Sequence, residues 1–126
     1  MSIRTPLGRA RGMGSAKTGT DHWWAQRVTA LALIPLVIWF VVSMIMVTGA
    51  DHETALAFIS SPINAVLLTI LIIATFYHGQ LGLQVVIGDY IHMKWLEVAL
   101  ILSVKGAALF LGVASVYAVI AIALGG

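Results

Sequence analysis

The sequence predicts an all-α integral membrane protein with three transmembrane helices. Its 126 residues are 60% hydrophobic and only 10% charged, whereas soluble domains carry about 25% charged residues. Three long apolar runs, at residues 28–49, 64–88 and 98–124, each exceed the ~20 residues that a helix needs to cross the bilayer core. Because backbone polar groups that face lipid must be satisfied within their own segment, each run is expected to be helical.

The first 27 residues form a basic, glycine-rich tail that we expect to be retained in the cytoplasm. The following run, residues 28–49, is too long for the apolar region of a signal peptide, and no small-residue cleavage site follows it. The expected organisation is therefore a tail over 1–27 and a three-helix transmembrane anchor domain over 28–126. Pro35 lies inside the first span and is expected to bend it, which neighbouring helices can tolerate.

The distribution of basic residues predicts the orientation of the chain in the membrane. Outside the spans, one side carries six Lys and Arg residues and the other side carries none. These six are Arg4, Arg9, Arg11, Lys17 and Arg27 before the first span, and Lys94 in the loop 89–97. The positive-inside rule places the N-terminus and this loop in the cytoplasm, and the loop 50–63 and the C-terminus on the opposite side.

The sequence also indicates where the spans begin and end. Within the first loop, residues 51–60 are expected to form a short interfacial helix. Ser61-Pro62 is typical of an N-cap followed by proline at the first helical position, so the second helix should start there. At the cytoplasmic boundary we expect an aromatic belt formed by Trp23, Trp24, Tyr90 and Trp95.

His78 is the most informative residue for function. Residues 64–88 contain no Asp, Glu, Lys or Arg, and His78 lies about 15 Å along the helix from Gly88, near the expected midplane of the bilayer. Ionisable side chains inside membrane spans are functional-site hypotheses, and imidazole is an axial ligand of haem iron. The alternative is a histidine that only hydrogen-bonds a neighbouring helix. The lack of cysteine excludes iron–sulfur ligation and covalent haem attachment by this chain.

Two further residues, Gly82 and Asp89, are expected to share a helix face with His78. Asp89 follows eleven residues later, which at about 100° per residue places both on nearly the same face. Gly82, one turn from His78, leaves room beside the imidazole. Asp89 would lie at the C-terminal end of its helix, where a negative charge is unfavourable, and this suggests a cationic partner or a proton-handling role. Arg27 is a candidate partner, either for Asp89 or for a haem propionate.

The second span ends in a specific pattern of residues. The pattern consists of His78, Gly82 four residues on, Gln84 two residues after that, and Asp89-Tyr90 at the helix exit. It resembles the haem-and-quinone motif of the succinate dehydrogenase hydrophobic membrane anchor subunit, the D chain of bacterial respiratory complex II. Residues 14–30 are similar to the region before the first helix in the alphaproteobacterial form of that subunit. The resemblance extends over essentially the whole chain.

This resemblance implies a function and a set of site residues. His78 would be one axial ligand of a low-spin haem b, with Gly82 packing against the haem. Tyr90 would hydrogen-bond a carbonyl oxygen of ubiquinone, and Asp89 would support the quinone site or proton uptake. Arg27 would support a haem propionate or the quinone site. The chain would be the membrane anchor of succinate:ubiquinone oxidoreductase in the bacterial inner membrane, with its C-terminus in the periplasm.

The resemblance also implies partner subunits. The second haem ligand would come from the cytochrome b anchor subunit, and this agrees with the single histidine found within the apolar runs. The flavoprotein and iron–sulfur subunits would dock on the cytoplasmic face, so the succinate-oxidising site would not lie in this chain. Membrane lipid would surround the spans, and no nucleic-acid partner is expected.

Three alternatives remain open at this point. A fumarate reductase-type anchor would pass electrons from quinol to fumarate. A structural membrane anchor without a redox role would use His78 for packing alone. A small transporter would normally contain paired intramembrane charges or an internal repeat, and the sequence contains neither. Lys105, inside the third span, is explained by a side chain that reaches toward the cytoplasmic boundary.

Overall fold

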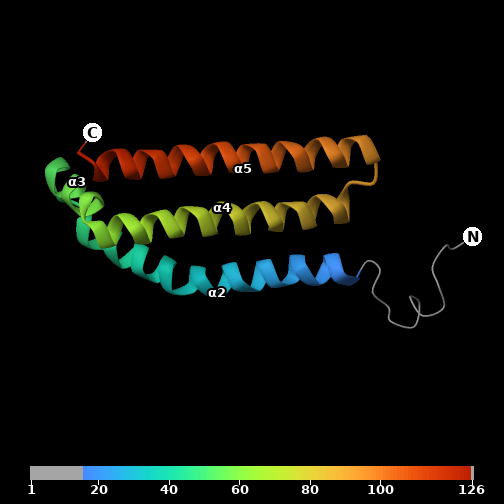
Figure 1. The fold of residues 1–126 in the computed structure, drawn as a ribbon, viewed down its shortest axis with the longest axis horizontal. Coiled ribbons are helices and arrows are strands. Elements are labelled where there is room, and N and C mark those ends of the chain that lie inside the picture. Colours follow the sequence, from blue (N-terminus) through green and yellow to red (C-terminus); the bar gives the residue numbers. More distant parts are fainter. Residues whose placement is uncertain (1–15, 126) are drawn as a thin grey trace, which may run out of the picture.

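The structure, a computed structural model, describes residues 16–125, with side chains from Thr20 onward. This part of the chain contains four helices and no strand. They are α2 (Ala16–Val47), α3 (His52–Ser60), α4 (Pro62–Tyr90) and α5 (Lys94–Ala123), shown in Figure 1. The three predicted spans are confirmed as α2, α4 and α5, and the predicted loop helix as α3. Helix α2 begins earlier than the apolar run at residue 28, and the predicted tail up to residue 15 lies outside the described residues.

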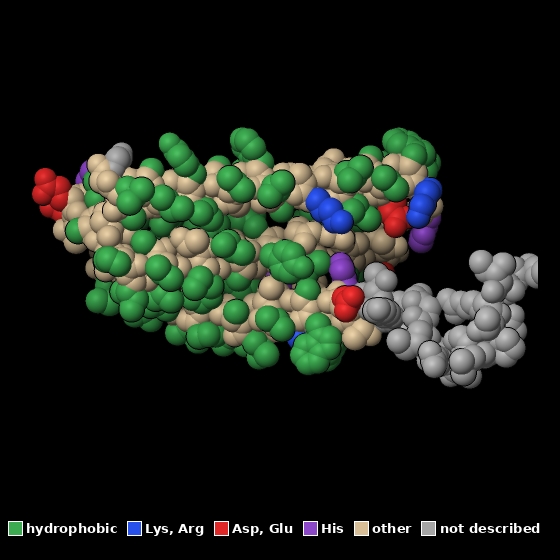
Figure 2. Space-filling model, in the orientation of Figure 1, with side chains coloured by type: hydrophobic (Ala, Val, Ile, Leu, Met, Phe, Trp, Pro, Cys, Tyr) green, Lys and Arg blue, Asp and Glu red, His purple; other side chains and the backbone are tan. Residues whose placement is uncertain are grey.

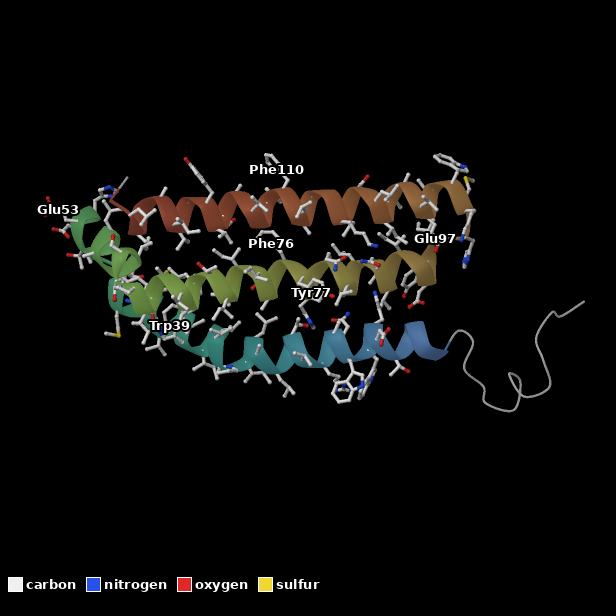
Figure 3. All side chains as sticks on the ribbon, in the orientation of Figure 1. Trp39, Glu53, Phe76, Tyr77, Glu97 and Phe110 are labelled. Atoms are coloured by element: carbon white, nitrogen blue, oxygen red, sulfur yellow. The ribbon has the colours of Figure 1, made fainter. Side chains whose placement is uncertain are left out.

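The three long helices lie side by side, with α4 in the middle (Figure 1). Helix α4 packs against both neighbours and supplies most of the small core. Its buried side chains are Leu68, Leu71, Ala74, Leu81 and Ile87, whereas α5 has no buried residue. Gly112 permits close packing of α5 against α4, because a Cβ at this position would lie 3.6 Å from Cδ2 of Phe76, the side chain that points toward α5 in Figure 3.

The outer surface of the helices is apolar. Helices α2, α4 and α5 are each long and apolar enough to cross a membrane, and no residue in the most apolar stretch of α5 is buried within the chain. On the face shown in Figure 2, hydrophobic side chains run along the whole length, and acidic groups lie toward the two ends. A helix that is apolar all round belongs in a membrane or in a large protein core. The chain is therefore a multi-pass membrane protein, and lipid or partner helices must cover its faces.

Contacts around α3 fix the end of the molecule opposite the start of α2. Trp39 of α2 stacks on Phe58 of α3 at 6.1 Å between ring centroids. The Ser60 hydroxyl donates to the Ile122 carbonyl of α5 at 3.2 Å, and the Asn64 amide donates to the Phe58 carbonyl at 3.0 Å. Ser61 occupies the N-cap position of α4 with Pro62 in the first turn, as the sequence predicts, although the Ser61 side chain makes no capping hydrogen bond. These contacts join all four helices at one end.

Asp51 caps α3, and its removal should loosen the first turn of that helix. Its carboxylate accepts the Thr54 amide hydrogen at 2.9 Å, and interactions with the Thr54 side chain and backbone amide lower the pKa of Asp51. The cap is therefore present at neutral pH and is lost as the pH falls through the lowered pKa. We expect Asp51→Ala to speed hydrogen–deuterium exchange at the Thr54 amide at neutral pH, because a capping acceptor is lost.

Asp51→Asn is the matched control for this prediction, since asparagine is an equally good N-cap. Exchange at Thr54 should therefore stay close to that of the unchanged protein in Asp51→Asn. Equal exchange in Asp51→Ala and Asp51→Asn would contradict the capping role.

Candidate functional site

His78 lies near the middle of α4, two residues after Phe76, which is the central residue of the helix. The helix is unbroken from Pro62 to Tyr90, so the predicted alignment of His78 with Asp89 along one face holds in the structure. The imidazole is half-buried and faces α2, because its Nδ1 lies 3.0 Å from Oγ1 of Thr29. The intramembrane histidine therefore has a defined partner on the neighbouring helix.

Thr29 itself is held by the backbone of α2. Its hydroxyl lies 2.7 Å from the carbonyl oxygen of Ala25 and 3.1 Å from that of Gln26. Threonine in a helix commonly donates to the carbonyl three or four residues earlier, and this fixes its side-chain rotamer. The hydroxyl that meets His78 is therefore a rigid group, positioned by the helix that carries it.

Gly82 lies opposite Gln26 of α2. A Cβ at Gly82 would be 4.0 Å from Nε2 of Gln26, and no other side-chain or backbone contact would be closer. The Gln26 oxygen Oε1 is buried and has no hydrogen-bond partner in the described part of the chain. A buried amide oxygen without a partner is costly, so this one requires a donor from water or from a molecule bound alongside. The predicted packing of haem against Gly82 stays a prediction, and the structure adds Gln26 to that surface.

Asp89 and Tyr90 are the last two residues of α4, and both are exposed. Tyr90 has 77% of its surface accessible, so its phenol is available to a molecule outside the chain. The α4 end has no basic residue in its last turn. Asp89 lies at the C-terminal end of α4, as the sequence predicts, but the last turn of the helix supplies no cation for it. The quinone-binding roles of both residues stay predictions.

Arg27 makes a different contact from the one considered with Asp89. Its guanidinium carbon lies 5.3 Å from the centroid of the Trp23 ring, in a cation–π arrangement. Within residues 20–125, the expected ion pair between Arg27 and Asp89 is not made. An exposed arginine stacked on tryptophan retains its donors for an anion, so support of a haem propionate or of the quinone site stays a prediction.

A groove of about 620 Å³ lies between α4 and α5. Its walls are mostly apolar, and its polar lining residues are Tyr77, Gln80, Lys105 and Tyr117. The Gln80 side chain also accepts a hydrogen bond from the Gln84 amide, one turn along α4. Lys105 and the hydrogen-bonded Gln80 therefore both line a mostly apolar groove. Lipid chains or a partner helix would cover this region.

The surroundings of His78 are compatible with one axial bond from this residue to haem iron. An axial ligand is a neutral imidazole nitrogen, and its other nitrogen normally donates to a neighbouring acceptor. Nδ1 of His78 has such a neighbour in Thr29, and Nε2 has no hydrogen-bond partner within residues 20–125. The described residues hold no group of three or more His, Cys, Asp or Glu that could bind a metal ion without further ligands. The donor set fits a haem shared with a second chain.

The sequence analysis did not identify Thr29 and Gln26 as site residues. Thr29 is separated from His78 by 49 positions, so only the packing of α2 against α4 brings the two together. A polar residue two positions after Arg27, in an otherwise apolar run, is the only indication in the sequence.

Comparisons with known proteins agree with this architecture. The model of a family described as "Succinate dehydrogenase/Fumarate reductase transmembrane subunit" matches residues 1–122. The chain is similar to the succinate dehydrogenase hydrophobic membrane anchor subunit of Rickettsia bellii, with 36% identity over 117 residues, covering 93% of this chain and 94% of the relative. The subunit of the same name from Paracoccus denitrificans is 34% identical over 104 residues, covering 82% of this chain and 81% of the relative. No solved structure matches the chain.

Proposed function

This chain belongs to the succinate dehydrogenase/fumarate reductase transmembrane subunit family, and from that premise we propose the chemistry of its site. It is a membrane anchor subunit. We propose that His78 is one axial ligand of haem b, and that Tyr90 and Asp89 form part of a ubiquinone site. The names of the relatives, which specify succinate dehydrogenase, favour quinone reduction by electrons from succinate over the fumarate reductase alternative.

The observation that carries the haem assignment is the environment of His78. A histidine near the middle of a membrane helix is expensive unless it serves a function, and its Nδ1 already meets the Thr29 hydroxyl. Nε2 is then the nitrogen available to iron. When bound, haem would accept and release one electron at a time. The residues of this chain would hold it through His78, with Gly82 and Gln26 alongside.

Tyr90 and Asp89 suit a quinone site at the membrane boundary. Reduction of ubiquinone to ubiquinol consumes two electrons and two protons, so the site needs a donor to the carbonyl oxygen and a route for protons from water. The exposed Tyr90 hydroxyl can donate to a carbonyl oxygen. The exposed carboxylate of Asp89 can accept a proton from water and pass it on. Both groups lie at the end of α4, within reach of water and electron-carrying partners.

The structure leaves a large surface for partner subunits. No residue of α5 is buried, and large exposed hydrophobic side chains lie along α2, α4 and α5. Six-coordinate haem requires a second axial group, and among the described histidines only His78 lies in the middle of a candidate span. We therefore propose that the cytochrome b anchor subunit supplies that ligand. The iron–sulfur and flavoprotein subunits would dock at the end that carries Tyr90.

The test of this proposal is purification of the intact complex through a tag on this chain in mild detergent. A dithionite-reduced minus oxidised spectrum should show a b-type haem, with three partner subunits present in the preparation. The haem content should be one per copy of this chain. An intact four-subunit complex without a haem signal would remove the haem assignment and leave a haem-free anchor.

A further inference from the structure

The hydrogen-bond contacts of Thr29 favour one tautomer of His78 over the other. The Thr29 hydroxyl has one hydrogen and three neighbours within hydrogen-bond distance: the Ala25 carbonyl at 2.7 Å, the Gln26 carbonyl at 3.1 Å and His78 Nδ1 at 3.0 Å. Carbonyl oxygens only accept, and the hydroxyl donates its hydrogen in its shortest contact, the one to Ala25. The contact with Nδ1 is then satisfied only if Nδ1 carries a hydrogen and donates it to the threonine oxygen.

A neutral imidazole has a single N–H group, so a proton on Nδ1 leaves a lone pair on Nε2. This is the tautomer that an axial ligand requires when Nε2 faces the metal. We propose that Thr29 is a positioning residue for the haem ligand: it holds His78 in the Nδ1–H tautomer and fixes the orientation of its ring. This inference rests on the proposed role of His78 as the axial ligand.

Two features of Thr29 suit this role. Its hydroxyl is anchored to the α2 backbone, so the acceptor is already in place before a haem binds. It is also half-buried and joins α2 to α4 through its contact with Nδ1. Hydrogen-bonded neighbours of metal-bound histidines raise the basicity of the ligand, and their loss typically weakens metal affinity 10–100-fold. The competing interpretation is a hydrogen bond that only joins two helices.

Thr29→Val is the decisive variant, because valine keeps the branched shape and removes the acceptor. In the purified complex we expect haem retention in a dilution series to weaken about tenfold. The midpoint potential should rise, because a less basic histidine stabilises the oxidised iron less. The low-spin electron paramagnetic resonance signal should also shift. Thr29→Ser, which keeps the hydroxyl, should remain close to the unchanged complex in all three measurements.

Thr69→Val is the matched control. The Thr69 hydroxyl also donates to the carbonyl four residues earlier, Ala65, at 2.8 Å, and the residue is half-buried in a membrane helix. It has no histidine partner, so its loss tests the general effect of removing such a hydroxyl. Thr69→Val should leave the potential and the resonance signal unchanged.

The outcomes distinguish failure of the proposed role of Thr29 from failure of the proposed role of His78 as a haem ligand. If Thr29→Val matches Thr69→Val in potential, resonance signal and haem retention, Thr29 only packs the helices and the inference is wrong. Thr29→Ala provides the same comparison where the valine variant does not assemble, and Thr29→Ser showing the same losses as Thr29→Ala would also overturn it. If His78→Ala retains an unchanged haem spectrum, the ligand assignment itself fails, whatever Thr29 does.

Discussion

Replacing His78 with alanine should remove haem b from the complex while leaving the anchor folded. The side chain is half-buried and is not part of the buried cluster of α4, so the helix packing keeps its main apolar contacts. Loss of an axial ligand should lower haem occupancy by more than about tenfold, because even loss of a neighbour that hydrogen-bonds a ligand costs that much. Any haem that remains would change from low-spin to high-spin. Haem content per complex and the reduced-minus-oxidised spectrum measure both effects.

His52→Ala is the control for this experiment. His52 is exposed at the first position of α3, at the end of the molecule away from Tyr90, so its loss should not change the spectrum. Subunit composition must be checked in parallel, since an unassembled complex also loses haem. A low-spin spectrum of normal intensity from assembled His78→Ala would show that another group binds the iron, and would return His78 to a packing role.

The helices could be predicted from the sequence because membrane helices depend on length and composition. Each of α2, α4 and α5 contains an apolar stretch long enough to cross a membrane, so no amphipathic period was needed to locate it, and Ser61-Pro62 marks the start of α4 correctly. Helix α2 continues beyond the apolar run toward the N-terminus and begins at Ala16. Residues 16–27 are polar and lie before the apolar run, and hydropathy does not distinguish a helix that continues beyond the bilayer from a separate tail. Which faces pack together was not predictable, because lipid and protein favour the same side chains.

The candidate site could likewise be predicted from the sequence only in part. His78 and Asp89 share a face because α4 is uninterrupted, and helix geometry alone predicts that relation. Contacts between helices could be identified only from the structure. Phe58 of α3 stacks on Trp39 of α2, and no pattern in the sequence indicates this contact. Arg27 stacks on Trp23, four residues earlier in the same helix, rather than pairing with Asp89. The role proposed for Thr29 depends on its contact with His78 on another helix.

Replacing Tyr90 with phenylalanine should weaken quinone reduction and spare the haem. The change removes only the phenolic hydroxyl from an exposed side chain, so folding and assembly should be unaffected. A hydrogen bond to a quinone carbonyl contributes roughly 1 kcal/mol, and succinate–quinone reductase activity should fall about tenfold if the bond strengthens as the carbonyl is reduced. Succinate oxidation with a soluble dye acceptor, which does not need the quinone site, should be unchanged.

Tyr117→Phe is the control that tests whether any loss of quinone reduction is specific to the Tyr90 hydroxyl. Tyr117 is also an exposed tyrosine, but it lies late in α5, toward the end opposite Tyr90. Its substitution removes an equivalent hydroxyl from the lipid-facing surface, and quinone reduction should stay normal. Asp89→Asn should also slow quinone reduction, because an amide cannot accept and pass on a proton. If Tyr90→Phe and Tyr117→Phe have equal, normal activity and equal sensitivity to quinone-site inhibitors, Tyr90 is only part of the aromatic belt, and the quinone must bind elsewhere on the complex.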